Sequence, residues 1–373
     1  MKQRVVLYDI DSKIPNLALM KISSYYKKLG YEAVLSKNIG FIEGKQHYAS
    51  TIFHRRKSIE KVAALKRLYG DKINIGGSGI NLNKRLPPEI EACFPDYDLY
   101  SFTNYAIGFI TRGCNQRCDF CLVPAKEGPL RRVASFDDFV LPQQTKVMLL
   151  DDNLLAYYDS DAILREIAVR GYEVNFSQSL DLTYLNDDNL ALLKKIHSRN
   201  SKFTKMMFYF SCNDTDTVRE FYDKKKLLSA FGDNSVGVIS MYGFNSHLSD
   251  DYQVLRMIQR LHFIPFLQEY WPIPNIPARI PADFFDYDLD VVIRMTFRAN
   301  GLNWEKYLRW LNRLYFSTFG KYYLPLLRII YRYNRRENIA NYLCQPGKLT
   351  EELYKTYRRS GPEPVPGGLE QSF

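Results

Sequence analysis

Short apolar runs that suit β-strands alternate with helical patterns along most of this chain. The first series lies in residues 1–95. It has an apolar run at 5–8, a helical pattern at 15–30, apolar runs at 32–35, 51–53 and 73–75, and a charged helical pattern at 58–69. Strands separated by helices predict parallel sheets, because a parallel crossover needs a connection about as long as a helix. We therefore expect an α/β protein with a small doubly wound, Rossmann-like domain over residues 1–95.

A second alternation of strands and helices begins near residue 107. The expected strands are at 107–112, 146–150, 173–178, 206–211, 235–241 and 263–267. Helical stretches are expected between them, near 160–170, 187–197, 215–230 and 249–261. This second series predicts six strands that also run parallel to one another.

Three cysteines follow the first of these six strands with the spacing C-x3-C-x2-C, at Cys114, Cys118 and Cys121. Three thiolates on one short loop can hold three irons of a cubane cluster, which leaves the fourth iron open to a small molecule. A structural zinc site would need a fourth ligand at zinc-like spacing. The other cysteines, which include Cys93 and Cys212, form no second C-x2-C pair. Zinc bound with a remote fourth ligand remains the alternative.

This cysteine motif resembles that of the radical SAM superfamily, in which an aromatic residue, here Phe120, precedes the last cysteine. The resemblance implies a partial (β/α)6 barrel over residues 96–290. It also implies that the three cysteines bind a 4Fe–4S cluster whose open iron chelates S-adenosylmethionine. One electron, from a donor such as flavodoxin or ferredoxin, would cleave that molecule to methionine and a 5′-deoxyadenosyl radical, which would abstract a hydrogen from the substrate.

The resemblance places the cofactor at the carboxyl ends of the strands, where several polar residues stand. Asp151, Asp152 and Asn153 follow the second strand and are expected to receive the amino group of S-adenosylmethionine; the alternative is a helix N-cap. Four further candidates stand at the ends of the third, fourth and fifth strands: Gln178, Ser211, Asn213 and Gly243. They would contact the ribose, methionine or adenosine portion of the cofactor, or the substrate. The alternative is that they form helix caps and turns.

A basic run follows the cysteine loop and contains Lys126, Arg131 and Arg132. Arg131 is our candidate for neutralising the carboxylate of S-adenosylmethionine, and a solvated basic loop is the alternative. The run resembles that of the tRNA methylthiotransferase branch of the superfamily. That branch has a second three-cysteine cluster, whereas residues 1–95 contain only Cys93, so sulfur insertion by that route is not expected.

Residues 1–95 resemble the cobalamin-binding modules found in many radical SAM proteins. The loop at 9–14 contains no histidine, so any cobalamin would lack the lower axial ligand that cobalamin mutases supply. A scaffold without cofactor is the alternative. The glycine run at 76–79 follows a strand, where it could cradle a phosphate or a nucleotide tail, or could form a tight turn with positive φ.

The positive charge is concentrated near the carboxyl end. Ten basic residues and one acid lie between Arg294 and Arg336, in a chain whose net charge is +10. Aromatic residues are interleaved at helical spacing, so residues 291–345 predict a basic helical region. Such a region suits RNA or another polyanion, a membrane surface, or a solvated face of packed helices. Residues 346–373 are rich in proline, glycine and charge and predict a flexible tail.

The sequence thus favours a radical SAM enzyme that modifies a small molecule, a peptide or RNA. The alternatives are a cobalamin-dependent radical SAM methyltransferase, an RNA-modifying enzyme of the superfamily, and a non-catalytic metal-binding module. No apolar stretch approaches the length of a membrane span, and no signal peptide is recognisable. We therefore expect a cytoplasmic location.

Overall fold

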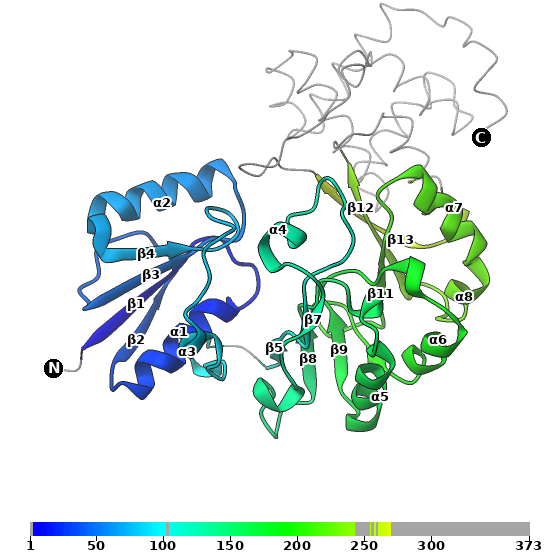
Figure 1. Ribbon diagram of the computed structural model, residues 1–373, viewed down its shortest axis with the longest axis horizontal. Coiled ribbons are helices and arrows are strands. Elements are labelled where there is room, and N and C mark those ends of the chain that lie inside the picture. Colours follow the sequence, from blue (N-terminus) through cyan, green and yellow to red (C-terminus); the bar gives the residue numbers. More distant parts are fainter. Residues whose placement is uncertain (1–2, 102–103, 243–253, 255–256, 259, 270–373) are drawn as a thin grey trace, which may run out of the picture.

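The computed structural model describes residues 3–101, 104–242, 254, 257–258 and 260–269. Two α/β units are visible in Figure 1, one built from the first hundred residues and one from residues 106–269. The expected basic region at 291–345 and the expected tail at 346–373 lie outside the described residues. Most of the expected helix at 249–261 does as well, although Val254, Met257, Ile258 and Arg260 are helical.

The first unit contains a parallel sheet of four strands in the order β2-β1-β3-β4. Its strands are β1 (Arg4–Asp9), β2 (Glu32–Ser36), β3 (Gln46–Ser50) and β4 (Ile73–Gly76). The expectation of an α/β domain is therefore confirmed. The apolar run at 51–53 is a loop, however, and β3 is the more polar segment before it, which periodicity missed. Its buried polar side chains are paired, because the Asn16 amide donates to the Ser50 hydroxyl and His47 contacts the Ile42 carbonyl.

Helices cover both faces of this sheet. Helix α1 (Leu17–Lys28) packs Leu19 and Ile22 on one face, and α2 (Arg56–Tyr69) packs Val62 and Leu65 on the other. Asn16 caps α1 by accepting from the Leu19 amide. A 3-10 turn, Gly70–Lys72, follows α2; α3 (Pro88–Glu91) and a second 3-10 turn, Tyr97–Leu99, complete the unit. The arrangement is doubly wound.

All six strands expected for the second unit are present and pair in parallel. They are β5 (Ala106–Gly108), β8 (Lys146–Leu149), β9 (Glu173–Phe176), β11 (Phe208–Ser211), β12 (Val236–Tyr242) and β13 (Ile264–Glu269). Their hydrogen bonds divide them into two sheets, β10-β9-β8-β5 and β11-β12-β13, where β10 (His197–Ser198) is an extra short strand. A single bridge, Leu180 to Phe210, joins the two. Within the described residues the expected partial barrel is thus an interrupted sheet with no closure.

The first of these expected strands is also broken. Residues 107–112 were expected to be continuous, but β5 ends at Gly108, and β6 (Thr111–Arg112) instead pairs antiparallel with β7 (Arg131–Arg132). The break occurs where the backbone amides of Ile110 and Thr111 donate to the Asp151 side chain rather than to a neighbouring strand.

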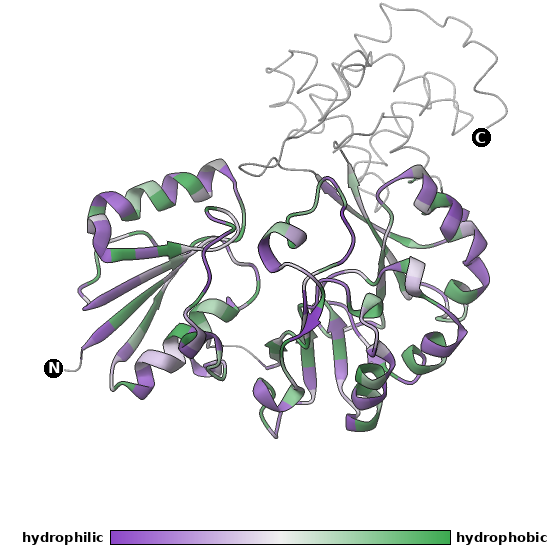
Figure 2. Cartoon of the chain, in the orientation of Figure 1, coloured by the Kyte–Doolittle hydropathy of each residue, from purple (hydrophilic) through white to green (hydrophobic). Residues whose placement is uncertain are grey.

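Helices and 3-10 turns fill the connections of the second unit. They are α4 (Val123–Glu127), Phe136–Asp138, Leu154–Ala156, α5 (Ser160–Arg170), Leu182–Tyr184, α6 (Asp187–Leu193), α7 (Thr215–Asp223) and α8 (Lys225–Ser229). In Figure 2 the longer helices carry both green and purple turns, as helices with one apolar face do. No helix of the described part of the chain is long and apolar enough to cross a membrane.

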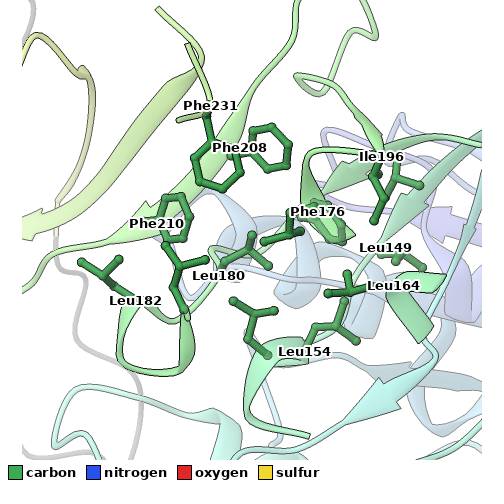
Figure 3. Packing of buried hydrophobic residues seen from close by; sticks show 14 of the residues in the cluster. Leu149, Leu154, Leu164, Phe176, Leu180, Leu182, Ile196, Phe208, Phe210 and Phe231 are labelled. Atoms are coloured by element: carbon green, nitrogen blue, oxygen red, sulfur yellow. The ribbon is translucent and has the colours of Figure 1, made fainter. Parts of the chain in front are cut away.

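The main core of the second unit lies between its strands and these helices (Figure 3). Leu149 and Phe176 come from β8 and β9, while Phe208 and Phe210 come from β11 and pack against Phe231. The apolar core is therefore continuous across the gap where the hydrogen-bond ladder is interrupted. Packing of side chains holds the two sheets together there.

A smaller cluster joins the two units. Leu17 and Met20 of α1 pack with Ile107 of β5 and Met148 of β8, and all four are buried. The Tyr97 hydroxyl, between the units, accepts from the Ile107 amide at 3.0 Å and donates to the Phe139 carbonyl. Its burial raises the pKa of Tyr97 to about 12. The amino-terminal unit therefore contacts the strand that leads directly into the cysteine loop.

Candidate functional site

The three cysteines lie in the loop between β6 and α4, and each has a free thiol. Cys114 and Cys121 are half-buried, while Cys118 is exposed. The Cys121 amide donates to the Cys118 carbonyl at 2.9 Å, which makes a tight turn between them. Two sulfurs already accept from backbone amides, Cys114 from Gln116 and Cys121 from Val123, each at 3.4 Å. Amide contacts of this kind favour sulfur in its anionic, ligating form.

The cysteine thiols influence one another. Burial is the main cause that raises the pKa of Cys121 to about 11, and the charges of Cys118 and Cys114 act in the same direction. Burial also raises the pKa of Cys118, with an additional effect of Cys114. As the described side chains stand, no three His, Cys, Asp or Glu residues are gathered closely enough to hold an ion. The donor set nevertheless suits iron and sulfide, because three free thiols on one short loop, two of which already accept from backbone amides, are ligands that a cluster uses.

Gly113 is required at the start of this loop. Its φ is +90°, and a Cβ atom there would lie 2.4 Å from the carbonyl oxygens of Gly128 and Pro129. The next residue closes the loop, since the Cys114 amide donates to the Gly128 carbonyl at 3.2 Å. The two ends of the cysteine loop are thereby fixed against each other.

Two carboxylates at the end of β8 hold the segment that leads into Cys114. Asp151 is buried and accepts from the Ile110 amide at 3.2 Å and from the amide and hydroxyl of Thr111 at 2.5 and 2.7 Å. Asp152 accepts from the Gly113 amide at 2.9 Å through one oxygen, Oδ2. Neither caps a helix. Burial is the main cause that raises the pKa of both Asp151 and Asp152 to about 6.

Asn153, the next residue, has an acceptor without a partner. Its side-chain amide donates through Nδ2 to Asp181 at 2.9 Å and to the Cys114 sulfur at 3.5 Å. These two acceptors fix the orientation of the amide, and its Oδ1 is buried with no hydrogen-bond partner in the described structure. Asn153 is 5% exposed and makes no side-chain cap bond to the 3-10 turn that follows. A buried, unpaired carbonyl oxygen beside a cysteine sulfur is suited to accept a donor from a ligand.

The other expected site residues differ in the hydrogen bonds that their side chains make. The Ser211 hydroxyl lies 2.7 Å from that of Ser179, which links the ends of β11 and β9 across the interruption. Asn213 accepts from the Met241 amide at 3.0 Å and so ties β11 to β12. Gln178 is exposed and makes no side-chain hydrogen bond among the described residues. Gly243 lies outside the described residues.

The two remaining expected residues lie in the cysteine loop and in the strand after it. The Arg131 guanidinium is exposed and donates to the carbonyls of Glu127 and Pro129, at 2.6 and 3.3 Å. Phe120 is half-buried between Cys118 and Cys121. Phe120 is therefore in the loop itself, while Arg131 is in β7, which pairs with β6 at the start of the loop.

Acidic residues after three strands influence the thiols of the cysteine loop. The charges of Asp181 and Asp214 raise the pKa of Cys118 after burial, and that of Asp152 raises the pKa of Cys121. Asp181 also caps the turn Leu182–Tyr184 by accepting from Thr183, and Asp214 caps α7. Direct contacts to the loop come from the end of β8, where Asn153 bonds to both Cys114 and Asp181.

The glycine run of the first unit serves the backbone. Gly77 has a φ of +100°, and a Cβ there would lie 2.1 Å from the Thr51 carbonyl oxygen; one on Gly79 would lie 2.6 Å from that of Phe53. The Thr51 amide and carbonyl bond to Gly76 and Gly79, each at 3.1 Å. The run lets two loops touch, which agrees with the tight-turn interpretation.

Comparisons with known proteins give a distant likeness. No protein-family model and no curated protein matches the chain. Crystal structures of Streptococcus suis SuiB, one bound to S-adenosylmethionine and one to the precursor peptide SuiA, align with a TM-score of 0.33 and 14% identity. The alignments cover 52% of this chain and 46% and 44% of those chains, so they span less than half of SuiB. No comparison supports a cobalamin-binding domain at residues 1–95.

Proposed function

We propose that this protein is a radical SAM enzyme that acts on a substrate yet to be identified. The observation that carries the proposal is the loop of three free thiols, with the buried Asn153 amide at the end of β8 lying 3.5 Å from the Cys114 sulfur. In this proposal Cys114, Cys118 and Cys121 hold a 4Fe–4S cluster. When bound, that cluster supplies the single electron that cleaves S-adenosylmethionine.

The protein's own residues have separate tasks in this proposal. Asn153 Oδ1 and the second oxygen of Asp152 receive the ammonium group of S-adenosylmethionine, because an ammonium offers three donors and favours anionic or carbonyl oxygen. Asp151 does not contact the cofactor in this proposal. Its oxygens already accept from Ile110 and Thr111, so it holds the segment before Cys114 in place.

The remaining contacts are assigned by position. Arg131 supplies positive charge to the carboxylate of S-adenosylmethionine from the exposed side of the loop. Gln178, Ser211 and Asn213 stand at the ends of the following strands and are the candidates for its ribose and methionine portions. The substrate class, whether small molecule, peptide or RNA, and an electron donor such as flavodoxin or ferredoxin are left to product and partner assays.

Anaerobic reconstitution with iron and sulfide tests the proposal. We expect a brown protein with the absorption and, after reduction, the electron paramagnetic resonance signal of a 4Fe–4S cluster, and a change in that signal when S-adenosylmethionine is added. A colourless protein that takes up one zinc would establish the structural metal module instead. A cluster whose electron paramagnetic resonance signal does not change when S-adenosylmethionine is added would also contradict the proposal.

Asn153→Ala isolates the ammonium contact. We expect normal iron content and about tenfold weaker binding of S-adenosylmethionine, equivalent to about 1.4 kcal/mol for one hydrogen bond to a charged donor. The matched control is Asn189→Ala, which also removes a buried asparagine but one whose bonds cap α6. That control lowers the thermal midpoint and leaves the affinity unchanged.

A further inference from the structure

Arg112 lies between the two anchored residues that precede Cys114. Thr111 is held by Asp151 and Gly113 by Asp152, both from the end of β8. The Arg112 side chain is 19% exposed, and its guanidinium lies 4.2 Å from the centre of the Phe109 ring. Its position in the chain is thus fixed from both sides while its charge is largely removed from solvent.

The guanidinium bridges the two units of the protein. Its Nη2 lies 3.1 Å from Glu91 Oε1, at the end of α3 in the amino-terminal unit. Its Nη1 lies 3.5 Å from Glu127 Oε2, at the end of α4, the helix that follows the cysteine loop. Glu91 is in turn held by Lys21 of α1, with Nζ 2.8 Å from the same oxygen. Charged groups from α1, α3, β6 and α4 therefore form one continuous chain.

Glu127, the last of these linked charged groups, is close to the start of the cysteine loop. The Glu127 side chain is 8% exposed, and the following residue, Gly128, accepts from the Cys114 amide. Glu127 raises and Arg112 lowers the pKa of Asp152, after the larger effect of burial, so both charges act on the strand-end carboxylate. An arginine that is largely shielded from solvent and shared by two carboxylates is most stable when both are present, because loss of one leaves its charge less well balanced.

We propose that Arg112 is a positioning residue through which Glu91 of the amino-terminal unit sets the position and charge environment of the cysteine loop. The proposal gives the amino-terminal unit a role that requires no cofactor of its own. The effect on the cluster rests on the proposed function, because it requires that a cluster is bound. The effect on the position of the cysteine loop does not depend on a cluster.

The loop is tested first in protein without iron, by hydrogen–deuterium exchange. Glu91→Gln is expected to speed exchange of the Gly113 and Cys114 amides about two- to fivefold, the range for one partly exposed ion pair. The matched control is Glu32→Gln, which breaks the Arg4–Glu32 pair elsewhere in that unit. It should leave the two loop amides unchanged. Equal exchange in wild type and Glu91→Gln, or an equal increase in Glu32→Gln, overturns the positioning role.

The charge environment is tested by the midpoint potential of the reconstituted cluster. Loss of a negative charge favours the added electron, so Glu91→Gln should raise the potential. Loss of a positive charge opposes it, so Arg112→Gln should lower the potential, and Arg112→Lys should restore it toward the wild-type value. If the substitutions only loosened the loop, the midpoint potential would shift in the same direction in both Gln variants. That result overturns the proposed effect of Glu91 and Arg112 on the charge environment.

The two proposals fail separately. If wild-type protein forms no 4Fe–4S cluster, the proposed function is wrong, and the exchange measurements still decide whether Glu91 positions the loop. If the cluster forms and neither the loop amides nor the potential respond to Glu91→Gln, the inference about Arg112 is wrong and the proposed function stands.

Discussion

At the carboxyl edge of the sheet in the amino-terminal unit a carboxylate is fully paired, whereas the corresponding edge of the second unit has a buried acceptor without a protein partner among the described residues. Asp11, just after β1, accepts four hydrogen bonds, from the hydroxyls of Thr51 and Ser58 and the amides of Ile52 and Phe53. At the other edge, Asn153 Oδ1 is buried with no hydrogen-bond partner in the described structure. Both edges have acids at the ends of parallel strands, but among the described residues they differ in this unpaired acceptor.

The difference shows that a strand-end position does not by itself make a binding site. The carboxyl ends of parallel strands are where α/β proteins bind ligands, and both edges satisfy that rule. What separates them is whether the polar groups are already paired within the fold. In the first unit Gly77 and Gly79 let two loops meet and Asp11 bonds across them, so the edge is filled by the protein itself.

The largest expected effect contrasts the loop cysteines with the buried cysteines Cys93 and Cys212, one in each unit. Cys118→Ala should lose essentially all cluster iron, because a three-thiolate site has no spare ligand. Cys93→Ala and Cys212→Ala should keep full iron content and change packing only, since both thiols are buried and neither belongs to the three-cysteine loop. Iron and sulfide analysis after anaerobic reconstitution measures this. Full iron with full cleavage of S-adenosylmethionine in Cys118→Ala would refute the proposed cluster site.

A glycine in each unit gives the next comparison. Gly77→Ala and Gly113→Ala both force a side chain into positive φ and against backbone oxygen. We expect Gly77→Ala to lower the free energy of unfolding by about 3 kcal/mol without affecting iron binding. Gly113→Ala should distort the cysteine loop, so it should lose iron binding.

Gly171→Ala is the control for these two variants. Its φ is +66°, but a Cβ there would meet nothing within 4 Å, so only the backbone conformation is strained. We expect a loss of about 1 kcal/mol in thermal or denaturant unfolding. A Gly77→Ala variant no less stable than Gly171→Ala would mean that the two loops of the first unit can separate easily.

Substitution of one acid at each edge distinguishes a structural from a ligand-binding carboxylate. Asp11→Asn should cost about 2 kcal/mol of unfolding free energy, because one of its oxygens becomes a donor facing amide donors. Asp152→Asn, which disturbs a single internal bond, should cost less and weaken binding of S-adenosylmethionine. Calorimetry of unfolding and of cofactor binding measures both. Weaker cofactor binding in Asp11→Asn at normal iron content would show that the first edge contributes to the site.

The smallest expected effect is a pH dependence at the edge of the second unit. The pKa of Asp152 is raised to about 6, so its carboxylate is formed as pH rises through that value. Binding of an ammonium needs the carboxylate, and affinity for S-adenosylmethionine should therefore increase about tenfold from pH 5 to pH 7. In Asp152→Asn the profile should be flat. An unchanged profile in that variant would assign the titration to another group.

The same shift has a consequence for stability. A carboxyl whose pKa is higher in the folded than in the unfolded state binds more protons when folded, so its contribution to stability falls as pH rises from about 4 to 6. Asp151 and Asp152 both act in this sense. The free energy of unfolding of Asp152→Asn should decline less over that range than that of the wild type.

Local patterns in the sequence predicted the elements that depend on near neighbours. The helical pattern at 15–30 and the strands of the second unit, the first of them only in part, follow from spacing and residue type. The cysteine spacing alone also placed three thiols on one loop, because the residues are too close in the chain to lie elsewhere. These features are set by periodicity and covalent geometry.

The tertiary structure decided which polar groups are paired, because that depends on residues far apart in the chain. Strand β3 is polar in sequence and was missed, yet it is paired between β1 and β4. The break after β5 exists because Asp151, about forty residues later, takes the amides of Ile110 and Thr111. The bridge from Glu91 to Arg112 likewise joins units whose contact no local pattern encodes. Hydrogen-bonding groups are identical in sequence whether satisfied or not, and only their distant partners decide which of them are paired.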